Sequence, residues 1–175
     1  IMEIIRQAQA QMRALGSRQW QDGYPARADI DRDIARGYGY VFEKSDAAEN
    51  PAAAETPQKY DKGTVPGGVI AYGAVVFDGE PAYGAIDGAW LTGGDYVVLH
   101  RLAVADGEKG RGVAAEFMRR TEALARGRGV GSFRVDTNFD NRYMLRMLER
   151  LRFAYCGKII YESGERLAFE KPFEA

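Results

Sequence analysis

The stretch EKGRGVAAEF, Glu108 to Phe117, sets two glycines and two cationic residues into four positions, Lys109–Gly112, and passes directly into an amphipathic helix. Glycine lacks the Cβ that would keep a ligand away from the backbone. A helix N-terminus offers unpaired N–H groups and roughly half a positive charge. The pattern predicts an anion-binding turn suited to a phosphate or diphosphate; an ordinary glycine-rich connection with solvated cations is the alternative.

The residues around this turn argue against the two commonest phosphate-binding loops. No Gly-Lys-Ser/Thr sequence follows it, as a Walker turn would require. Nor is there a spaced G-x-G-x-x-G with an acidic residue after the next strand, as in a dinucleotide-binding unit. An ATP-binding loop is therefore disfavoured.

Periodic apolar positions indicate the secondary structure on both sides of the turn. Asp29 and Asn141 are the expected N-caps of two of the helices. The order α, α, β, β, β, α, β, α, β, β predicts an α+β, or mixed α/β, fold around one sheet. Helices are expected at 1–15, 29–35, 112–126 and 141–151, and strands at 37–43, 69–77, 96–104, 132–137, 154–161 and 165–171.

The length of 175 residues predicts a single domain, 1–175, with a large enough core to fold without cross-links. The segment 44–68 is rich in Ala, Pro, Glu, Lys and Gly and lacks a period, which predicts a mobile insertion inside a hairpin. No N-cap residue precedes Ile1, so a short strand before it is expected to be missing.

The composition excludes several classes of protein. A net charge of -1 gives no basic field that would attract nucleic acid or a membrane surface. One cysteine forbids an internal disulfide, and one histidine disfavours a zinc site, so no metal is expected. No apolar run approaches the roughly 18 residues of a membrane span. These features predict a cytoplasmic globular protein.

The segment Lys109–Ala114, KGRGVA, resembles the Q/R-x-x-G-x-G/A signature of the GNAT superfamily of acyl-CoA N-acetyltransferases, with lysine where glutamine or arginine is usual. Between Arg6 and Lys171, further segments resemble, in order, the blocks of a bacterial subgroup: QWQDGYP, DRDI, HRLAV, RVDTNFDNRYM, LRFAYCGKIIY and RLAFEK. The resemblance implies a mostly antiparallel twisted sheet with a splayed central strand pair and helices on both faces.

What the resemblance implies about function is acetyl transfer from acetyl-CoA to a primary amine of a small molecule or peptide, in a protein that can be a homodimer. The backbone of the turn would bind the pyrophosphate, a bulged strand would pair with the pantetheine arm, and two asparagines would contact the same arm. These cofactor-binding residues are Lys109, Gly110, Arg111, Gly112, Val113 and Ala114 in the turn, Leu102, Ala103 and Val104 in the strand, and Asn138 and Asn141. As an alternative, Asn141 only caps its helix.

His100 is the candidate general base. Strand alternation would place it on one face with Val98, Leu102 and Val104. An ordinary imidazole titrates near neutral pH, and some relatives use a histidine at this place to take the proton of the amine. A hydrogen-bonded structural histidine is the alternative.

The sequence leaves open which residue acts as the general acid. Leu148 occupies the position at which the family often carries a tyrosine that protonates the departing thiolate. Tyr155 and Tyr161 are possible replacements, with packing as their alternative role. Cys156 could suggest an acyl-enzyme, but a buried, inert thiol on a strand is the preferred interpretation.

Trp20 and Tyr24 lie in the loop that covers the acceptor site in the family, where aromatic rings beside Asp22 could hold a cationic amine. Alternatively Trp20 fills the core and Asp22-Gly23 forms a turn. A different class of function is also open, namely an acyl-CoA-binding regulatory module without catalysis.

Overall fold

The computed structural model describes residues 1–44 and 68–174, so the predicted insertion lies outside the described residues apart from its two ends. The chain divides into two compact units. Unit 1 comprises Ile1–Val75 and Arg101–Arg120, and unit 2 comprises Val76–His100 and Thr121–Ala175. The prediction of one domain therefore stays a prediction, and the two units are described in turn.

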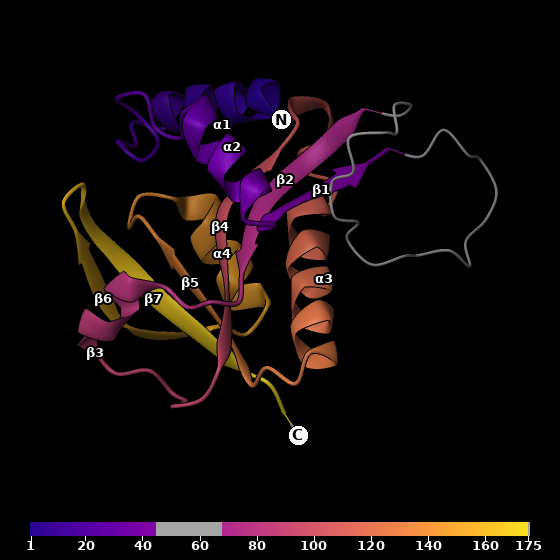
Figure 1. Ribbon diagram of the computed structural model, residues 1–175. Helices are drawn as coiled ribbons and strands as arrows, with labels where there is room; N and C mark the ends of the chain where they lie inside the picture. Colours follow the sequence, from indigo (N-terminus) through magenta and orange to yellow (C-terminus); the bar gives the residue numbers. More distant parts are fainter. Residues whose placement is uncertain (45–67, 175) are drawn as a thin grey trace. The chain divides into compact units, whose positions relative to one another are not determined.

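The described residues form four α-helices and a seven-stranded sheet, which confirms the mixed α+β class (Figure 1). The strand order is β1-β2-β4-β5-β7-β6-β3. β4 and β5 are parallel, whereas β1–β2, β5–β7, β6–β7 and β3–β6 pair antiparallel. The helices are α1 (Met2–Ala14), α2 (Arg27–Ala35), α3 (Val113–Gly127) and α4 (Arg142–Arg150), and the strands are β1 (Gly39–Glu43), β2 (Val69–Val76), β3 (Asp87–Gly88), β4 (Tyr96–Val104), β5 (Ser132–Thr137), β6 (Ala154–Tyr161) and β7 (Gly164–Pro172).

Unit 1 has helices on both faces of its strands. Successive residues of a strand point to opposite faces. Val41 of β1 accordingly joins a core cluster with residues of α1 and α2, while Phe42 packs on Phe117 of α3 with ring centroids 4.8 Å apart. The cluster consists of Ile4, Ile5, Ala8, Trp20, Ile30, Val41, Tyr72 and Ala103.

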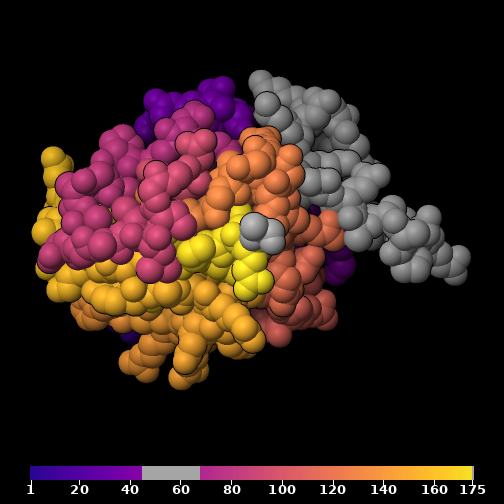
Figure 2. Space-filling model, turned by 90° about the horizontal axis from the view of Figure 1, so that it is seen from below, coloured from indigo at the N-terminus to yellow at the C-terminus, as the bar shows by residue number. Residues whose placement is uncertain are grey.

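Unit 2 builds its core on the face of β5 that carries Phe133 and Val135. Phe133 meets Phe153 edge to face at 5.2 Å, and α4 buries Met147 and Leu148. Figure 2 shows the yellow C-terminal residues bordered by orange residues. Arg126, in the last turn of α3, lies 4.7 Å from the Phe173 ring centroid and donates to the Glu174 carbonyl.

The two central strands separate, and one of them contains a left-handed residue. The β4–β5 ladder pairs Tyr96–Val98 with Ser132–Arg134, whereas β5 continues through Thr137 in its pairing with β7. Within β4, Arg101 has a φ of 56°, in the left-handed region. A residue of this kind interrupts the pleat. The predicted common face of Val98, His100, Leu102 and Val104 is therefore interrupted at Arg101.

Some local predictions need correction. Ala26, not Asp29, is the N-cap of α2, and the Asp29 carboxylate accepts the Ala26 N–H at 2.8 Å from the third helical position. Two short 3₁₀ helices, η1 (Pro81–Ala85) and η2 (Asp106–Glu108), and the two-residue strand β3 carry no periodic signal and were not predicted. Among the described residues, no helix combines the length and the apolar character that crossing a membrane requires.

Candidate functional site

The glycine turn of unit 1 joins η2 to α3. Gly110 and Gly112 have φ values of +77° and +82°, which side-chain-bearing residues rarely adopt. Among the described residues, no heavy atom lies within 4 Å of the position that a Cβ would take at either glycine. Both are exposed, so the turn leaves open space above its backbone.

The helix that follows supplies the donors. Its first bond runs from the Glu116 N–H to the Gly112 carbonyl at 2.9 Å, so the N–H groups of Val113, Ala114 and Ala115 precede the helical ladder. The Lys109 N–H differs, because it donates to the Asp106 carbonyl at 3.3 Å. Among the predicted backbone donors, the Lys109 N–H is therefore already bonded within η2, and the binding of an anion by the turn stays a prediction.

The cationic side chains of the turn are held by neighbouring carboxylates. Lys109 Nζ contacts Asp106 Oδ1 at 2.5 Å, and Arg111 contacts Glu108 Oε2 at 3.0 Å. Glu108 also accepts from Lys44 at 3.1 Å. Hydrogen bonds from Lys44 first, and then from Arg111, lower the pKa of Glu108. An anion that binds to Lys109 or Arg111 has to replace their carboxylate partners, and such exposed ion pairs are weak.

Arg101 of β4 is tied to Asp33 of α2 by a buried ion pair. Arg101 donates through Nε to Asp33 Oδ2 at 2.7 Å and through a second nitrogen to Oδ1, and the two side chains are 16% and 5% exposed. Tyr72 donates its hydroxyl to the same carboxylate at 2.7 Å. Burial first, and this hydrogen bond second, raise the pKa of Tyr72. A left-handed arginine is thus locked in place directly before Leu102.

The remaining site residues predicted in unit 1 lie either in β4 or in the loop between α1 and α2. Leu102 is partly buried, and Ala103 and Val104 are buried, as expected for a strand that continues past Arg101. Trp20 is 9% exposed within the core cluster, which supports its packing role. Tyr24, in contrast, is 43% exposed and accepts a hydrogen bond from Arg101 at 2.8 Å.

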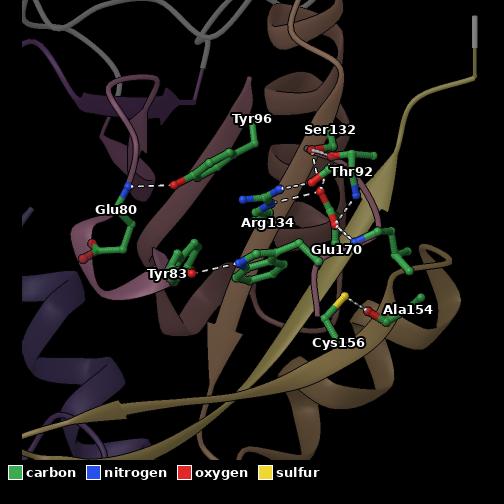
Figure 3. A network of polar contacts seen from close by, with 11 residues as sticks. Glu80, Tyr83, Thr92, Tyr96, Ser132, Arg134, Ala154, Cys156 and Glu170 are labelled. Carbon is green, nitrogen blue, oxygen red and sulfur yellow. Dashed lines mark hydrogen bonds and ion pairs between the residues drawn. The ribbon is translucent and has the colours of Figure 1, made fainter. Parts of the chain in front are cut away.

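Unit 2 pairs His100 with a carboxylate that the sequence did not suggest. His100 Nε2 lies 3.0 Å from Glu80 Oε2, and the side chains are 19% and 23% exposed. Glu80 precedes η1, and its other oxygen accepts the Ala82 N–H at 3.2 Å. Its backbone N–H donates to the Tyr96 hydroxyl at 3.2 Å, as Figure 3 shows.

Two tyrosines of unit 2 share one carboxylate. The hydroxyls of Tyr83 and Tyr161 donate to Asp136 Oδ2 at 2.8 and 3.1 Å. Burial first, and the charge of Asp136 second, raise the pKa of both phenols. Tyr161 is therefore a weaker acid than an ordinary tyrosine, and its proton is already engaged.

The other site residues that the sequence predicts in unit 2 cap a helix, lie buried or pack against a neighbouring ring. Asn141 caps α4 by accepting the Met144 N–H at 3.2 Å, which confirms it as the N-cap, and its contact with the cofactor stays a prediction. Asn138 is buried at the end of β5, and Leu148 is buried in the core. Tyr155 is exposed and meets Phe169 edge to face.

The single thiol is not set up as a nucleophile. Cys156 is buried, and burial first, followed by the charge of Glu170, raises the pKa of the thiol. Its sulfur lies 3.5 Å from the Ala154 carbonyl (Figure 3). A thiol needs its thiolate form to attack, so these surroundings support the inert interpretation.

A second buried ion pair organises unit 2. Arg134 Nε donates to Glu170 Oε1 at 2.9 Å, and the side chains are 6% and 0% exposed. Glu170 also accepts from the backbone of Leu91 and from Thr92 and Ser132, and Figure 3 shows these contacts converging on one carboxylate. The network fixes the loop before β4.

Sequence reasoning missed four polar residues that the structure makes prominent: Asp33, Glu80, Arg101 and Asp136. Each finds its partner far along the chain, as Glu80 does with His100 and Asp33 with Arg101. A spacing of 20 or 68 residues leaves no periodic trace. Among residues 1–44 and 68–174, no group of three or more His, Cys, Asp or Glu side chains could hold a metal ion.

The chain is similar in sequence and in structure to known proteins. The sequence profile of the "Acetyltransferase (GNAT) family" matches residues 18–153. No curated protein sequence matches the chain. The crystal structure of a GNAT family acetyltransferase from Streptococcus agalactiae is 34% identical, with 99% of this chain and 88% of that chain covered and a TM-score of 0.79.

More distant structures share the fold. A GNAT family acetyltransferase from Listeria monocytogenes is 18% identical, covers 98% of this chain and 86% of its own, and has a TM-score of 0.68. The NatC complex bound to Gag peptide and CoA matches at 13% identity, 86% and 82% coverage and a TM-score of 0.58. The matched family profile spans most of the chain, and the streptococcal structure is more than 30% identical over nearly its full length. This chain therefore belongs to the GNAT acetyltransferase family.

Proposed function

We propose that the protein is an N-acetyltransferase that moves the acetyl group of acetyl-CoA to a primary amine of a small molecule or peptide. The observation that carries this proposal is the open glycine turn before α3, in a chain of the GNAT family. A structure of the same fold, the NatC complex, is bound to CoA and a peptide. The near-neutral charge and the single cysteine support a cytoplasmic location.

The residues of the turn fit the diphosphate of CoA. The N–H groups from Gly110 to Ala114 would bind the phosphate oxygens, because they lie at a helix N-terminus and no Cβ of the two glycines blocks them. The backbone of Leu102–Val104 would bind the pantetheine arm in the manner of an added strand. Asn138 and Asn141 would approach the same arm.

The chemistry needs a neutral amine. Its nitrogen forms a bond to the thioester carbonyl carbon, the carbon–sulfur bond breaks, and the sulfur leaves as a thiolate. A protonated acceptor first gives a proton to His100, which we propose as the general base. Once the nitrogen is bonded to the carbonyl carbon, it loses a second proton to water and becomes the amide nitrogen. Leu148 has no proton to give and Tyr161 is engaged by Asp136, so the thiolate takes its proton from solvent.

The proposal is tested by incubating the protein with acetyl-CoA and a panel of amines, amino acids and peptides while free CoA is measured. Release of CoA together with a mass increase of one acetyl group on an amine supports the function. Tight CoA binding without turnover on any amine would support the regulatory module instead.

A matched pair of variants tests the turn. Gly112→Ala puts a methyl group where the anion approaches and is expected to raise the KM for acetyl-CoA roughly tenfold, about 1.4 kcal/mol of binding. Gly129→Ala is the control, because Gly129 has a similar φ of +74° and equally open surroundings beyond the end of α3. Equal effects of the two variants on KM would contradict the assignment.

His100→Gln tests the base. General-base catalysis contributes typically 10²- to 10⁴-fold, so kcat/KM for the amine is expected to fall by roughly that range while the KM for acetyl-CoA changes little. An unchanged kcat/KM and pH profile would exclude His100 from this role.

A further inference from the structure

Glu80 stands out among the polar residues of unit 2 because its carboxylate is fixed at both oxygens. Oε1 accepts the Ala82 N–H at 3.2 Å and thereby caps η1, while Oε2 lies 3.0 Å from His100 Nε2. The side chain is about a quarter exposed, so the pair lies at the edge of the solvent.

The backbone on either side holds this carboxylate in place. The Glu80 N–H donates to the Tyr96 hydroxyl, and Pro81 restricts the chain at the start of η1. Tyr83, two residues further, has its ring centroid 6.4 Å from that of His100. Glu80 therefore meets the imidazole from a rigid turn.

The chemistry of the two groups decides which nitrogen carries the proton. An ionised carboxylate can only accept a hydrogen bond, so His100 Nε2 has to be the donor. In the neutral imidazole, the lone pair is then on Nδ1. Second partners of this kind commonly fix the tautomer and orientation of functional histidines.

We propose that Glu80 is a positioning residue for the general base: it holds His100 as the Nε2–H tautomer and leaves Nδ1 to accept the proton of the acceptor ammonium. The inference rests on the proposed function. When the ammonium gives its proton to Nδ1, the imidazolium that forms is stabilised by the adjacent carboxylate. The proton then passes to water, and Glu80 stays ionised throughout.

The tautomer can be observed without any substrate. His100 is the single histidine of the chain, so ¹⁵N-labelled protein gives one pair of imidazole nitrogen signals. At a pH where the ring is neutral, the wild-type protein is expected to show a protonated Nε2 and an unprotonated Nδ1. A wild-type protein with the proton on Nδ1 would overturn the inference even if no variant folded.

The kinetic test uses Glu80→Gln, which keeps the shape of the side chain and removes its charge. It is expected to lower kcat/KM for the amine roughly 10- to 100-fold, a part of what general-base catalysis contributes, with little change in the KM for acetyl-CoA. In a His100→Gln background the same substitution should have no further effect, because Glu80 acts through His100. The imidazole signals of Glu80→Gln should show both tautomers.

Glu165→Gln is the matched control, since it makes the same carboxylate-to-amide change at a residue that pairs with Lys158 on the exposed hairpin and not with His100. It should leave the tautomer and kcat/KM nearly unchanged. Equal losses in Glu165→Gln and Glu80→Gln would mean that the loss of a negative charge anywhere in the unit, and not the contact with His100, is responsible, and would overturn the inference. An active wild-type enzyme whose Glu80→Gln variant is equally active would refute the positioning role alone, whereas no turnover on any amine would refute the proposed function and the inference with it.

Discussion

Two buried arginine–carboxylate pairs, one in each unit, use the same chemistry on different backbones. Arg134 meets Glu170 in unit 2 from a regularly paired strand, whereas Arg101 meets Asp33 in unit 1 from a left-handed position inside β4. A left-handed residue with a side chain costs roughly 1–2 kcal/mol. The first pair holds a loop, and the second supports a distorted strand next to the candidate cofactor-binding residues. We therefore expect similar burial and bonding to serve a structural role in unit 2 and to support cofactor binding in unit 1.

The largest effect is expected from breaking the pair of unit 2. Glu170→Gln leaves Arg134 buried without its counter-charge and turns an amide group toward N–H donors, so the free energy of unfolding should fall by about 3–5 kcal/mol. Urea denaturation measures this loss. The double variant Arg134→Met with Glu170→Gln removes both charges, keeps an acceptor for the donors of Thr92 and Ser132, and should lose less than the single variant. A loss below about 1 kcal/mol in Glu170→Gln would show that the network is not a main support of the unit.

Breaking the pair of unit 1 should affect stability and binding together. Asp33→Asn is expected to cost about 2–4 kcal/mol of unfolding free energy, because Arg101 loses its counter-charge. It should also weaken CoA binding roughly tenfold, or about 1.4 kcal/mol, because the left-handed backbone at Arg101 relaxes. Calorimetric titration of both variants sharpens the comparison, since Glu170→Gln should bind CoA as the wild-type protein does. If the two variants bind CoA equally well, the proposed difference between the pairs is wrong.

The Arg134–Glu170 pair of unit 2 should also make the free energy of unfolding decrease at acidic pH. Burial alone would raise the pKa of Glu170, but hydrogen bonds from Thr92, Ser132 and Arg134 outweigh it and the pKa is lowered. A carboxyl whose pKa is lower in the folded than in the unfolded state stabilises the fold at pH values above its unfolded-state pKa, which is about 4.3 for glutamate. That stability is lost as the pH falls through the folded value. Unfolding free energies measured from pH 7 downward should therefore fall more steeply for the wild type than for Glu170→Gln, and parallel curves would contradict the assignment.

The smallest effects concern the two tyrosines around Asp33 and Arg101. Tyr72→Phe removes a buried hydrogen bond to a carboxylate and should cost about 1 kcal/mol. Tyr24→Phe removes an exposed contact and should cost less than about 0.5 kcal/mol. Thermal denaturation of the two variants side by side gives the ranking. The reverse order would mean that the loop around Tyr24, and not the buried carboxylate, limits the stability of unit 1.

The same contrast explains what the sequence could predict. Apolar periodicity located α1, α3, α4 and the long strands, and the glycine pattern located the turn, because these signals lie within a few neighbouring residues. Asp33–Arg101 and Glu80–His100 join residues that are distant in the chain, and no local pattern marks either pair. The role of Asp29 was misassigned because an acidic residue at the third helical position carries the same compositional signal as an N-cap.

The central claim is that the backbone N–H groups between Gly110 and Ala114 bind the diphosphate of CoA. Titrating ¹⁵N-labelled protein with CoA, and separately with pantetheine lacking phosphates, tests it residue by residue. The account predicts that CoA shifts the amide signals of Gly110–Ala114 most strongly and that pantetheine leaves them nearly unchanged. Saturable CoA binding whose largest shifts fall outside this turn, or no binding at all, would contradict it.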